Sequence, residues 1–220
     1  MPSPKRHAIY LEVAPRRTFA GSIDWPGWTR GGRTEADAFD ALLACGPRYA
    51  TVAGSGFAVP KDVFAFEVVE RLRGGATTDF GAPGEIPEAD SRPLTAPELE
   101  RQVRLLKAAW RALESAAGAA AGAKLRTGPR GGGRDLPKTL GHVLDAEASY
   151  LAKLGARHDG ANGDHVQLRS AVTEALAAIG AGREVASPNA VKKRWPPRYF
   201  VRRASWHVLD HAWEIEDRAS

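Results

Sequence analysis

The chain has 220 residues, 43% of them hydrophobic and 26% charged, with a formal net charge of +5 at pH 7. This composition is typical of a globular protein and excludes an intrinsically disordered chain. No apolar run is long enough to cross a bilayer, and the first residues carry charge where a signal peptide needs an apolar core. We therefore expect a cytoplasmic protein with no membrane partner. The single Cys45 excludes an internal disulfide and a cysteine zinc cluster.

Charge is distributed unevenly along the chain. Acidic residues outnumber basic ones in residues 1–90, and basic residues outnumber acidic ones in residues 91–220. The segment 73–93 at this change is rich in Gly and Pro and has no periodic apolar pattern, which is typical of a linker. We expect two domains, residues 1–72 and 94–220, joined by this linker.

The first domain is predicted to combine strands with one helix. Residues 7–13 and 17–24 are short runs with β-branched and aromatic residues, and they suit a hairpin. Residues 25–33 have the composition of a turn, and residues 63–72 alternate as a strand does. We expect the order βββαβ, an α+β module.

The helix of this domain is predicted to begin after Thr34. Asp37 follows three residues later, close to a capping box, and apolar residues then recur on one helical face. Gly46 and Pro47 are expected to end or kink this helix. Beside them, Cys45 is expected to be a small buried residue. The alternative is a nucleophile, but no histidine is visibly paired with it.

The stretch "YLEVAPRRTFAGSIDWPGWTRGGRTEADAFDALLA" resembles the HicB-like antitoxin fold, in which two strands and a D-x-P-G turn precede a Gly-Thr step and a helix. The resemblance covers residues 7–45. The matching residues are Asp24, Pro26, Gly27, Gly32, Thr34, Glu35 and Ala36. The sequence shows no DNA-binding segment attached to this module. We therefore favour a structural or lid-forming role over an antitoxin role, because a fold does not imply a function.

The second domain is predicted to be helical throughout. Thr95 with Glu98 makes a capping box, and Asp135 precedes a second run with helical periodicity. The expected helices cover residues 96–121, residues from 136 to at least 154, residues 163–181, and residues from about 195 to 218. Four amphipathic helices of similar length predict a four-helix bundle.

Two histidines lie four residues apart on the last of these helices. His207 and His211 project from one face, which suits two ligands of one metal ion. The zinc-protease motif needs Glu directly after the first histidine, where this chain has Val208. The paired Glu-x-x-His motifs of di-iron bundles are absent from the sequence as well.

His142 adds a third candidate ligand from the second helix of the bundle. It lies among apolar residues such as Leu140 and Val143, where an unpartnered histidine would be costly to bury. One such histidine alone is more often a satisfied core residue. Together with His207 and His211 it gives three nitrogen ligands on facing helices, with coordination positions left open. The sequence therefore predicts a three-histidine metal site.

The segments "RWPPRYFVRRASWHVLDHAWEIEDR" and "TLGHVLDAEASYLAKLG" resemble the last and the second helix of the DinB-like (YfiT-type) metalloproteins. The resemblance covers residues 94–218. It implies an up-down-down-up bundle, a divalent metal (zinc or nickel) on the three histidines, and a homodimer. The family includes thiol transferases and isomerases that use mycothiol or bacillithiol.

Three residues of the last helix are candidate catalytic residues. Tyr199 and Arg203 precede the first histidine by two turns and one turn, and could contact an anionic or carbonyl group of a substrate. The alternative is a packed tyrosine and a solvated arginine. Glu214, like Asp145 and Asp210, follows a histidine by three residues and could hold its second nitrogen or act as a general base. The alternative for each carboxylate is an ordinary surface charge.

Two basic segments suggest other ligands, which we do not favour. Residues 128–134, "GPRGGGR", combine Gly and Arg as phosphate loops do, but lack the Gly-Lys-Ser/Thr ending, so a flexible interhelical loop is preferred. Residues 192–203, "KKRWPPRYFVRR", could touch phosphates, but their aromatic residues start an amphipathic helix and are expected to pack. Nucleic acid is therefore not an expected partner.

We expect a divalent-metal-dependent transferase that acts on a small-molecule substrate with a low-molecular-weight thiol such as mycothiol. The alternative is a non-catalytic role, as a metal-stabilised binding protein or an antitoxin-like stress-response protein. Thiol-dependent turnover would support the first, and specific DNA or toxin association without turnover would support the second.

Overall fold

The structure, a computed structural model, describes residues 6–128, 133–157, 164–185 and 194–219. The chain divides into two compact units, Met1–Arg92 and Pro93–Ser220. The first unit contains a four-stranded sheet and the second is built of helices, so the chain is α+β as expected. None of the helices in the described residues combines the length and the apolarity that crossing a bilayer requires.

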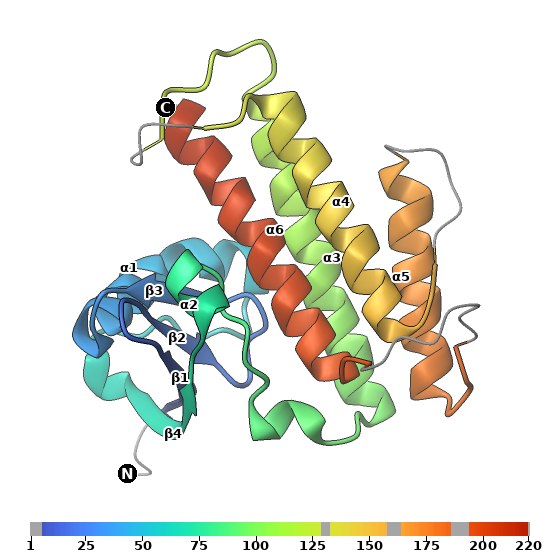
Figure 1. Ribbon diagram of the computed structural model, residues 1–220, viewed down its shortest axis with the longest axis horizontal. Helices are drawn as coiled ribbons and strands as arrows, with labels where there is room; N and C mark the ends of the chain where they lie inside the picture. Colours follow the sequence, from blue (N-terminus) through green and yellow to red (C-terminus); the bar gives the residue numbers. More distant parts are fainter. Residues whose placement is uncertain (1–5, 129–132, 158–163, 186–193, 220) are drawn as a thin grey trace. The chain divides into compact units, whose positions relative to one another are not determined.

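The sheet of the first unit consists of β1 (His7–Val13), β2 (Thr18–Ser22), β3 (Thr29–Gly32) and β4 (Phe66–Arg73) (Figure 1). The strands lie in the order β3-β2-β1-β4. β1 and β3 are both antiparallel to β2, which confirms the predicted hairpin, whereas β4 is parallel to β1. A parallel pair needs a crossover connection, and the helix α1 (Glu35–Ala53) lies in this connection and packs on β2 and β3.

The order βββαβ is confirmed, and its third strand, β3, lies within the segment 25–33, whose composition was interpreted as that of a turn. The turn is confined to the residues before β3, where Gly27 has a φ of 91°. β3 then pairs with β2, and a Cβ added to Gly31 would lie 2.8 Å from the ring of Phe19. The glycine that lowers the local strand propensity therefore leaves the space that this ring occupies.

Helix α1 begins after Thr34, as predicted. Thr34 and Asp37 form the capping box, with bonds of 3.0 and 3.1 Å between side chains and main-chain N–H groups. Pro47 lies inside α1 and does not end it. A proline removes one main-chain hydrogen bond, but the fully buried Leu42 and Tyr49 on either side hold the helix against the sheet.

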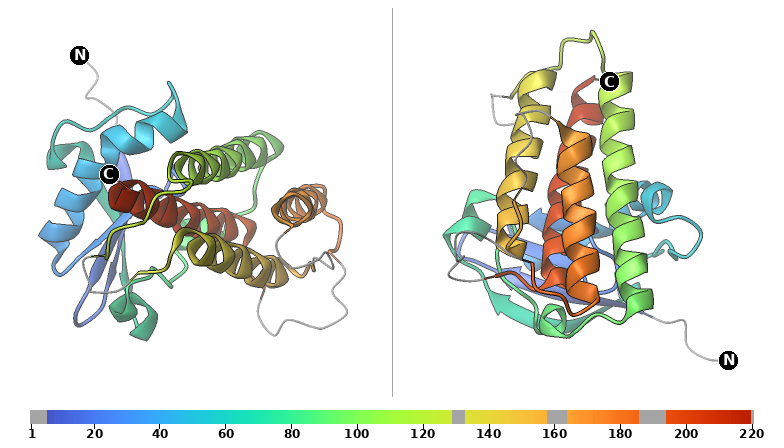
Figure 2. Two further views of the ribbon diagram at one scale, coloured as in Figure 1. Left: turned by 90° about the horizontal axis from the view of Figure 1, so that it is seen from above. Right: turned by 90° about the vertical axis from the view of Figure 1, so that its right-hand side faces the viewer.

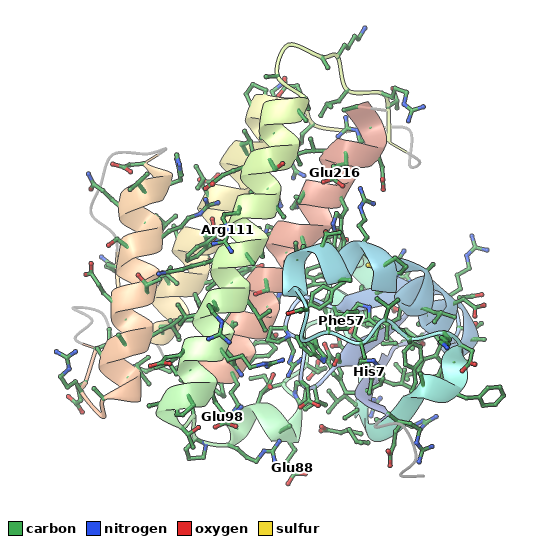
Figure 3. The ribbon with its side chains drawn as sticks, turned by 180° about the vertical axis from the view of Figure 1, so that it is seen from behind. His7, Phe57, Glu88, Glu98, Arg111 and Glu216 are labelled. Carbon is green, nitrogen blue, oxygen red and sulfur yellow. The ribbon has the colours of Figure 1, made fainter. Side chains whose placement is uncertain are left out.

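The core of the first unit is rich in aromatic side chains. Trp28 Nε1 donates to a carbonyl of α1 at 3.0 Å, and the Tyr49 hydroxyl donates to a carbonyl in the turn before β3 at 2.8 Å. His7 and Phe57 lie together in this unit, with ring centroids 5.4 Å apart (Figure 3). Cys45 is buried, as expected.

The segment 73–93, expected to be a linker, is instead folded within the first unit. It contains α2 (Ala76–Phe80) and a short 3-10 helix, η2 (Glu88–Ser91). The boundary between the two compact units follows this segment, at Arg92. Its Gly and Pro residues form the turns between these short helices. The helices are too short to produce an apolar periodicity in the sequence.

A buried carboxylate anchors this segment to β1. Glu12, which is fully buried, accepts hydrogen bonds from the Thr78 hydroxyl at 2.5 Å and from the N–H groups of Gly84 and Glu85 at 2.9 and 3.1 Å. Burial raises the pKa of Glu12, and these hydrogen bonds oppose that rise. Two of these three donors are main-chain N–H groups, which leave no signature in the side-chain pattern.

Replacing Glu12 by glutamine is expected to lower the free energy of unfolding by about 1–3 kcal/mol, because one oxygen becomes an amide nitrogen that cannot accept. Denaturant unfolding followed by tryptophan fluorescence measures the change. Glu67→Gln, at an exposed position of β4, is the control and should stay within about 0.5 kcal/mol of the wild type. Equal stability of both variants would contradict the anchoring role of Glu12.

The second unit contains α3 (Ala96–Ala119), α4 (Leu136–Leu154), α5 (His165–Gly180) and α6 (Pro197–Ala219). All four predicted helices are present, and Figure 2 shows them packed side by side. α3 and α6 run in one direction and α4 and α5 in the other, which is the expected up-down-down-up order (Figure 1). At the shared start of α3 and α6, Arg198 pairs with Glu98 at 2.7 Å (Figure 3).

A buried polar cluster fixes how α4 sits against its neighbours. Glu147 of α4 accepts a hydrogen bond from Trp110 Nε1 of α3, and its other oxygen lies 3.5 Å from Arg169 Nε of α5. Arg169 also pairs with Glu114 of α3 at 2.5 Å. Separating a buried charge from its partner costs about 3–5 kcal/mol, so this cluster opposes any sliding of α4, the helix that carries His142.

Candidate metal centre

Helices α4 and α6 bring the three predicted metal ligands together. α6 presents His207 and His211, which are 6% and 9% exposed. α4 runs antiparallel to α6 and places the half-buried His142 opposite them. The candidate ligand atoms of the three residues all lie within 4.8 Å of one another. The three histidines are therefore close enough to hold one metal ion.

The spacing of the ring nitrogens suits an ion between them. Nε2 of His142 lies 3.3 Å from Nε2 of His207. Two nitrogen ligands that are each about 2.0–2.1 Å from a tetrahedral zinc ion are about 3.3–3.4 Å apart. The ring of His211 completes the triangle, with centroids 4.7 and 5.0 Å from the other two rings.

Burial keeps two of these imidazoles neutral. The pKa of His207 is lowered to about 2, chiefly by burial and in addition by the charges of His211 and Arg203. Burial also lowers the pKa of His142, with the charge of Arg134 adding to the effect. Histidine binds a metal ion through the neutral ring, so both side chains are ready to bind at pH 7 without losing a proton.

His211 is oriented by a chain of two hydrogen bonds. Its Nδ1 lies 2.8 Å from Oε2 of Glu214, and Arg218 Nη1 donates to the other oxygen of Glu214 at 2.8 Å. The hydrogen bond with His211 lowers the pKa of Glu214, so the carboxylate is ionised and accepts from Nδ1–H. This leaves Nε2 of His211 free as a metal ligand, in the carboxylate–histidine arrangement that orients such ligands.

Arg218 connects this chain to the loop before α4. Its Nε donates to the carbonyl of Arg126 at 2.7 Å, and its Nη2 donates to the carbonyl of Arg134 at 2.8 Å. The loop is thus attached to the residue that holds Glu214. The phosphate-loop alternative for residues 128–134 includes residues 129–132, which lie outside the described residues.

Replacing Glu214 by alanine is expected to weaken zinc binding by about 10–100-fold, because His211 loses the acceptor that fixes its ring. Competition with a chromogenic zinc chelator measures the affinity. Glu216→Ala removes an exposed carboxylate two residues away on α6 (Figure 3) and should bind zinc like the wild type. If the two variants bind zinc equally, Glu214 does not support the metal ligand.

The other two acidic candidates differ from Glu214. Nδ1 of His207 is buried and has no hydrogen-bond partner among the described residues, so Asp210 does not hold it. Asp145 contributes its charge to His142 and thereby raises its pKa slightly against the effect of burial. Of the three carboxylates considered, Glu214 is the one that the structure bonds to a ring nitrogen.

Arg203 lies near the histidines. It is half-buried, its Cζ lies 5.6 Å from the ring centroid of Tyr150, and that ring lies 5.8 Å from the ring of His207. The contacts of Arg203 therefore place it beside the three-histidine cluster. Contact with a substrate stays a prediction for Arg203, as does a general-base role for Glu214.

Tyr199 has a different setting. It is buried, and its ring packs edge-on against Trp195 with centroids 4.9 Å apart. The basic segment 192–203 begins with two residues outside the described ones, but its aromatic residues pack inside the unit, as expected. A contact of Tyr199 with a substrate remains a prediction.

Two residues of the site were missed by the sequence analysis. Tyr150 follows His142 by eight residues, and Arg218 follows His211 by seven, so each lies about two turns further along the same helical face. Their spacing could have identified them as neighbours of the histidines. Their partners could not be identified, because the loop carbonyls and the Arg203 side chain come from other segments.

Comparison with known proteins adds no further constraint. No protein-family model, curated protein or solved structure matches this chain. The three histidines and the side chains around them are therefore the features that indicate a function.

Proposed function

We propose that His142, His207 and His211 hold one divalent ion, zinc or nickel, and that the protein is a metal-dependent transferase acting on a small molecule. The main support is the convergence of three ligand atoms within 4.8 Å of one another. Imidazole nitrogens are suitable ligands for both ions, and three of them leave coordination positions for a substrate or cofactor.

We further propose that the helical unit is related to the DinB-like metalloproteins and the first unit to the HicB-like fold. Two observations support the first relation: the up-down-down-up order of the helices, and the position of one histidine on α4 and two on α6. The strand and helix order of the first unit supports the second relation. The homodimer of the DinB-like family is part of this proposal.

The proposed cofactor is a low-molecular-weight thiol such as mycothiol. A divalent ion at the three histidines would stabilise the thiol as its thiolate, which is the nucleophilic form. In the transfer, the sulfur forms a bond to an electrophilic carbon of the substrate, and the leaving group departs with the bonding electron pair. The thiol proton goes to the leaving group or to solvent, so charge is balanced.

The test is turnover of mycothiol with a panel of alkyl and acyl electrophiles, followed by loss of free thiol. Metal-loaded wild type should exceed the uncatalysed rate, and His142→Ala treated identically should not. His165→Ala, which removes an exposed histidine at the start of α5, is the matched control and should keep full activity. If metal-loaded wild type, metal-free protein and His142→Ala all match the uncatalysed rate, the non-catalytic alternative replaces this proposal.

A further inference from the structure

Arg203 has an unused hydrogen-bond donor beside the three histidines. Its Nη1 is buried and has no hydrogen-bond partner among the described residues. The guanidinium lies against two aromatic rings, with Cζ 4.6 Å from the Trp206 centroid and 5.6 Å from the Tyr150 centroid. A buried donor of a charged group without an acceptor is destabilising. Such a donor is explained if a ligand provides the missing acceptor.

Arg203 lies in the same region of the helical unit as the metal ligands. Arg203 precedes His207 by one turn of α6. The Tyr150 ring contacts both side chains, at 5.6 Å from Arg203 Cζ and 5.8 Å from the His207 ring. The hydroxyl of Tyr150 is a hydrogen-bond donor as well.

The charges around the site favour an anion. Histidine binds a metal ion as an uncharged ligand, so three histidine ligands would leave the two positive charges of a divalent ion uncompensated. Arg134 and Arg203 add positive charge that reaches His207. The negative charges of Asp145 and Glu214 reach His142. His211 and Arg218 occupy both oxygens of Glu214. A negatively charged ligand would therefore be attracted to both the ion and Arg203.

We propose that Arg203 and the Tyr150 hydroxyl form a carboxylate-binding subsite, so that the small molecule bound at the three-histidine centre carries a carboxylate. This inference rests on the proposed function and specifies its substrate class. Arginine binds carboxylates through short, charge-assisted hydrogen bonds, and its planar donors match the two oxygens of the group. The carboxylate fixes the ligand at Arg203 while its reactive end reaches the ion.

Cobalt-substituted protein allows the subsite to be tested without turnover. The probes are 3-mercaptopropionate and 3-mercaptopropanol, which share a thiol and differ in the carboxylate. The thiolate-to-cobalt absorption band reports binding of each. The wild type should bind the carboxylate probe at least tenfold more tightly. Arg203→Met, which keeps an unbranched side chain but removes the charge and the donors, should lose this preference, and Arg203→Lys should keep part of it.

The outcomes separate the subsite from the thiol chemistry. If both thiols produce the band without a preference, or Arg203→Met keeps the preference, the subsite is wrong and the thiol proposal stands. If neither thiol produces a band, the thiol proposal is wrong. The subsite is then tested by comparing the binding of propionate with that of propionamide, each followed by shifts of the cobalt ligand-field bands. A preference for propionate that depends on Arg203 then supports the subsite, and equal binding of the two overturns it.

Discussion

Zinc is expected to stabilise the wild-type protein by about 4 kcal/mol at a free concentration about 1,000 times its dissociation constant, and His142→Ala is expected to abolish this gain. The reason is that an ion bound to the folded state alone shifts the unfolding equilibrium by mass action. For a chain of this length, the gain corresponds to a rise in Tm of roughly 10 °C. Thermal unfolding followed by circular dichroism, with and without zinc, measures it.

His142→Ala is the most informative of the three ligand variants because its own folding should be unaffected. His142 is half-buried on α4, and alanine favours the helix, so the metal-free variant should lie within about 1 kcal/mol of the wild type. His165→Ala should keep the full gain from zinc. If His142→Ala gains as much stability from zinc as the wild type does, the ion binds elsewhere.

Acid is expected to destabilise the metal-free wild type more steeply than the metal-free His207→Gln variant. Burial lowers the pKa of His207 from 6.5 to about 2 in the folded protein, whereas the unfolded chain takes up a proton near pH 6.5. The unfolded state therefore binds more protons between these values, and stability falls as pH falls. The difference between the two proteins should grow by about 1.4 kcal/mol for each pH unit below 6.5.

Urea unfolding of both proteins between pH 7.5 and pH 5, after chelation of metal, measures this difference. Between pH 7.5 and pH 5, the wild type should lose about 2 kcal/mol more of its free energy of unfolding than His207→Gln does. Other titrating groups are common to both proteins and cancel in the comparison. Parallel stability curves across this range would mean that His207 titrates normally and is not buried as described.

The helical unit could be predicted from the sequence because its signals are local. The capping box at Thr95 and Glu98 marks the start of α3, and Asp135 marks the start of α4. The helical repeat then fixes which residues share a face, so the placement of His207 and His211 on one side of α6 required no knowledge of the rest of the fold.

The parts that escaped prediction depend on partners far along the chain. The strand character of β3 depends on the ring of Phe19, which occupies the space above Gly31. The segment 73–93 is held by Glu12, whose buried carboxylate lies more than sixty residues earlier. Neither interaction changes the local pattern of apolar residues, which is the signal that sequence analysis uses.

The site shows the same division. Helix spacing identified His207 and His211 as metal ligands, and the apolar neighbours of His142 identified the third. Antiparallel packing of α4 and α6 brings the three together. Spacing alone could not rank the carboxylates that follow each histidine by three residues. Glu214 is distinguished from Asp210 by Arg218, which holds its second oxygen and is itself fixed by carbonyls of the loop before α4.

Metal content is the most direct test of the three-histidine centre. Protein purified without a histidine tag, and the variants His142→Ala, His207→Ala and His211→Ala prepared identically, would be offered zinc and nickel, desalted and assayed by elemental analysis. We expect one ion per chain in the wild type and in His165→Ala, and loss of the ion in each of the three variants. A wild type that stays metal-free, or variants that retain the ion, would contradict this expectation.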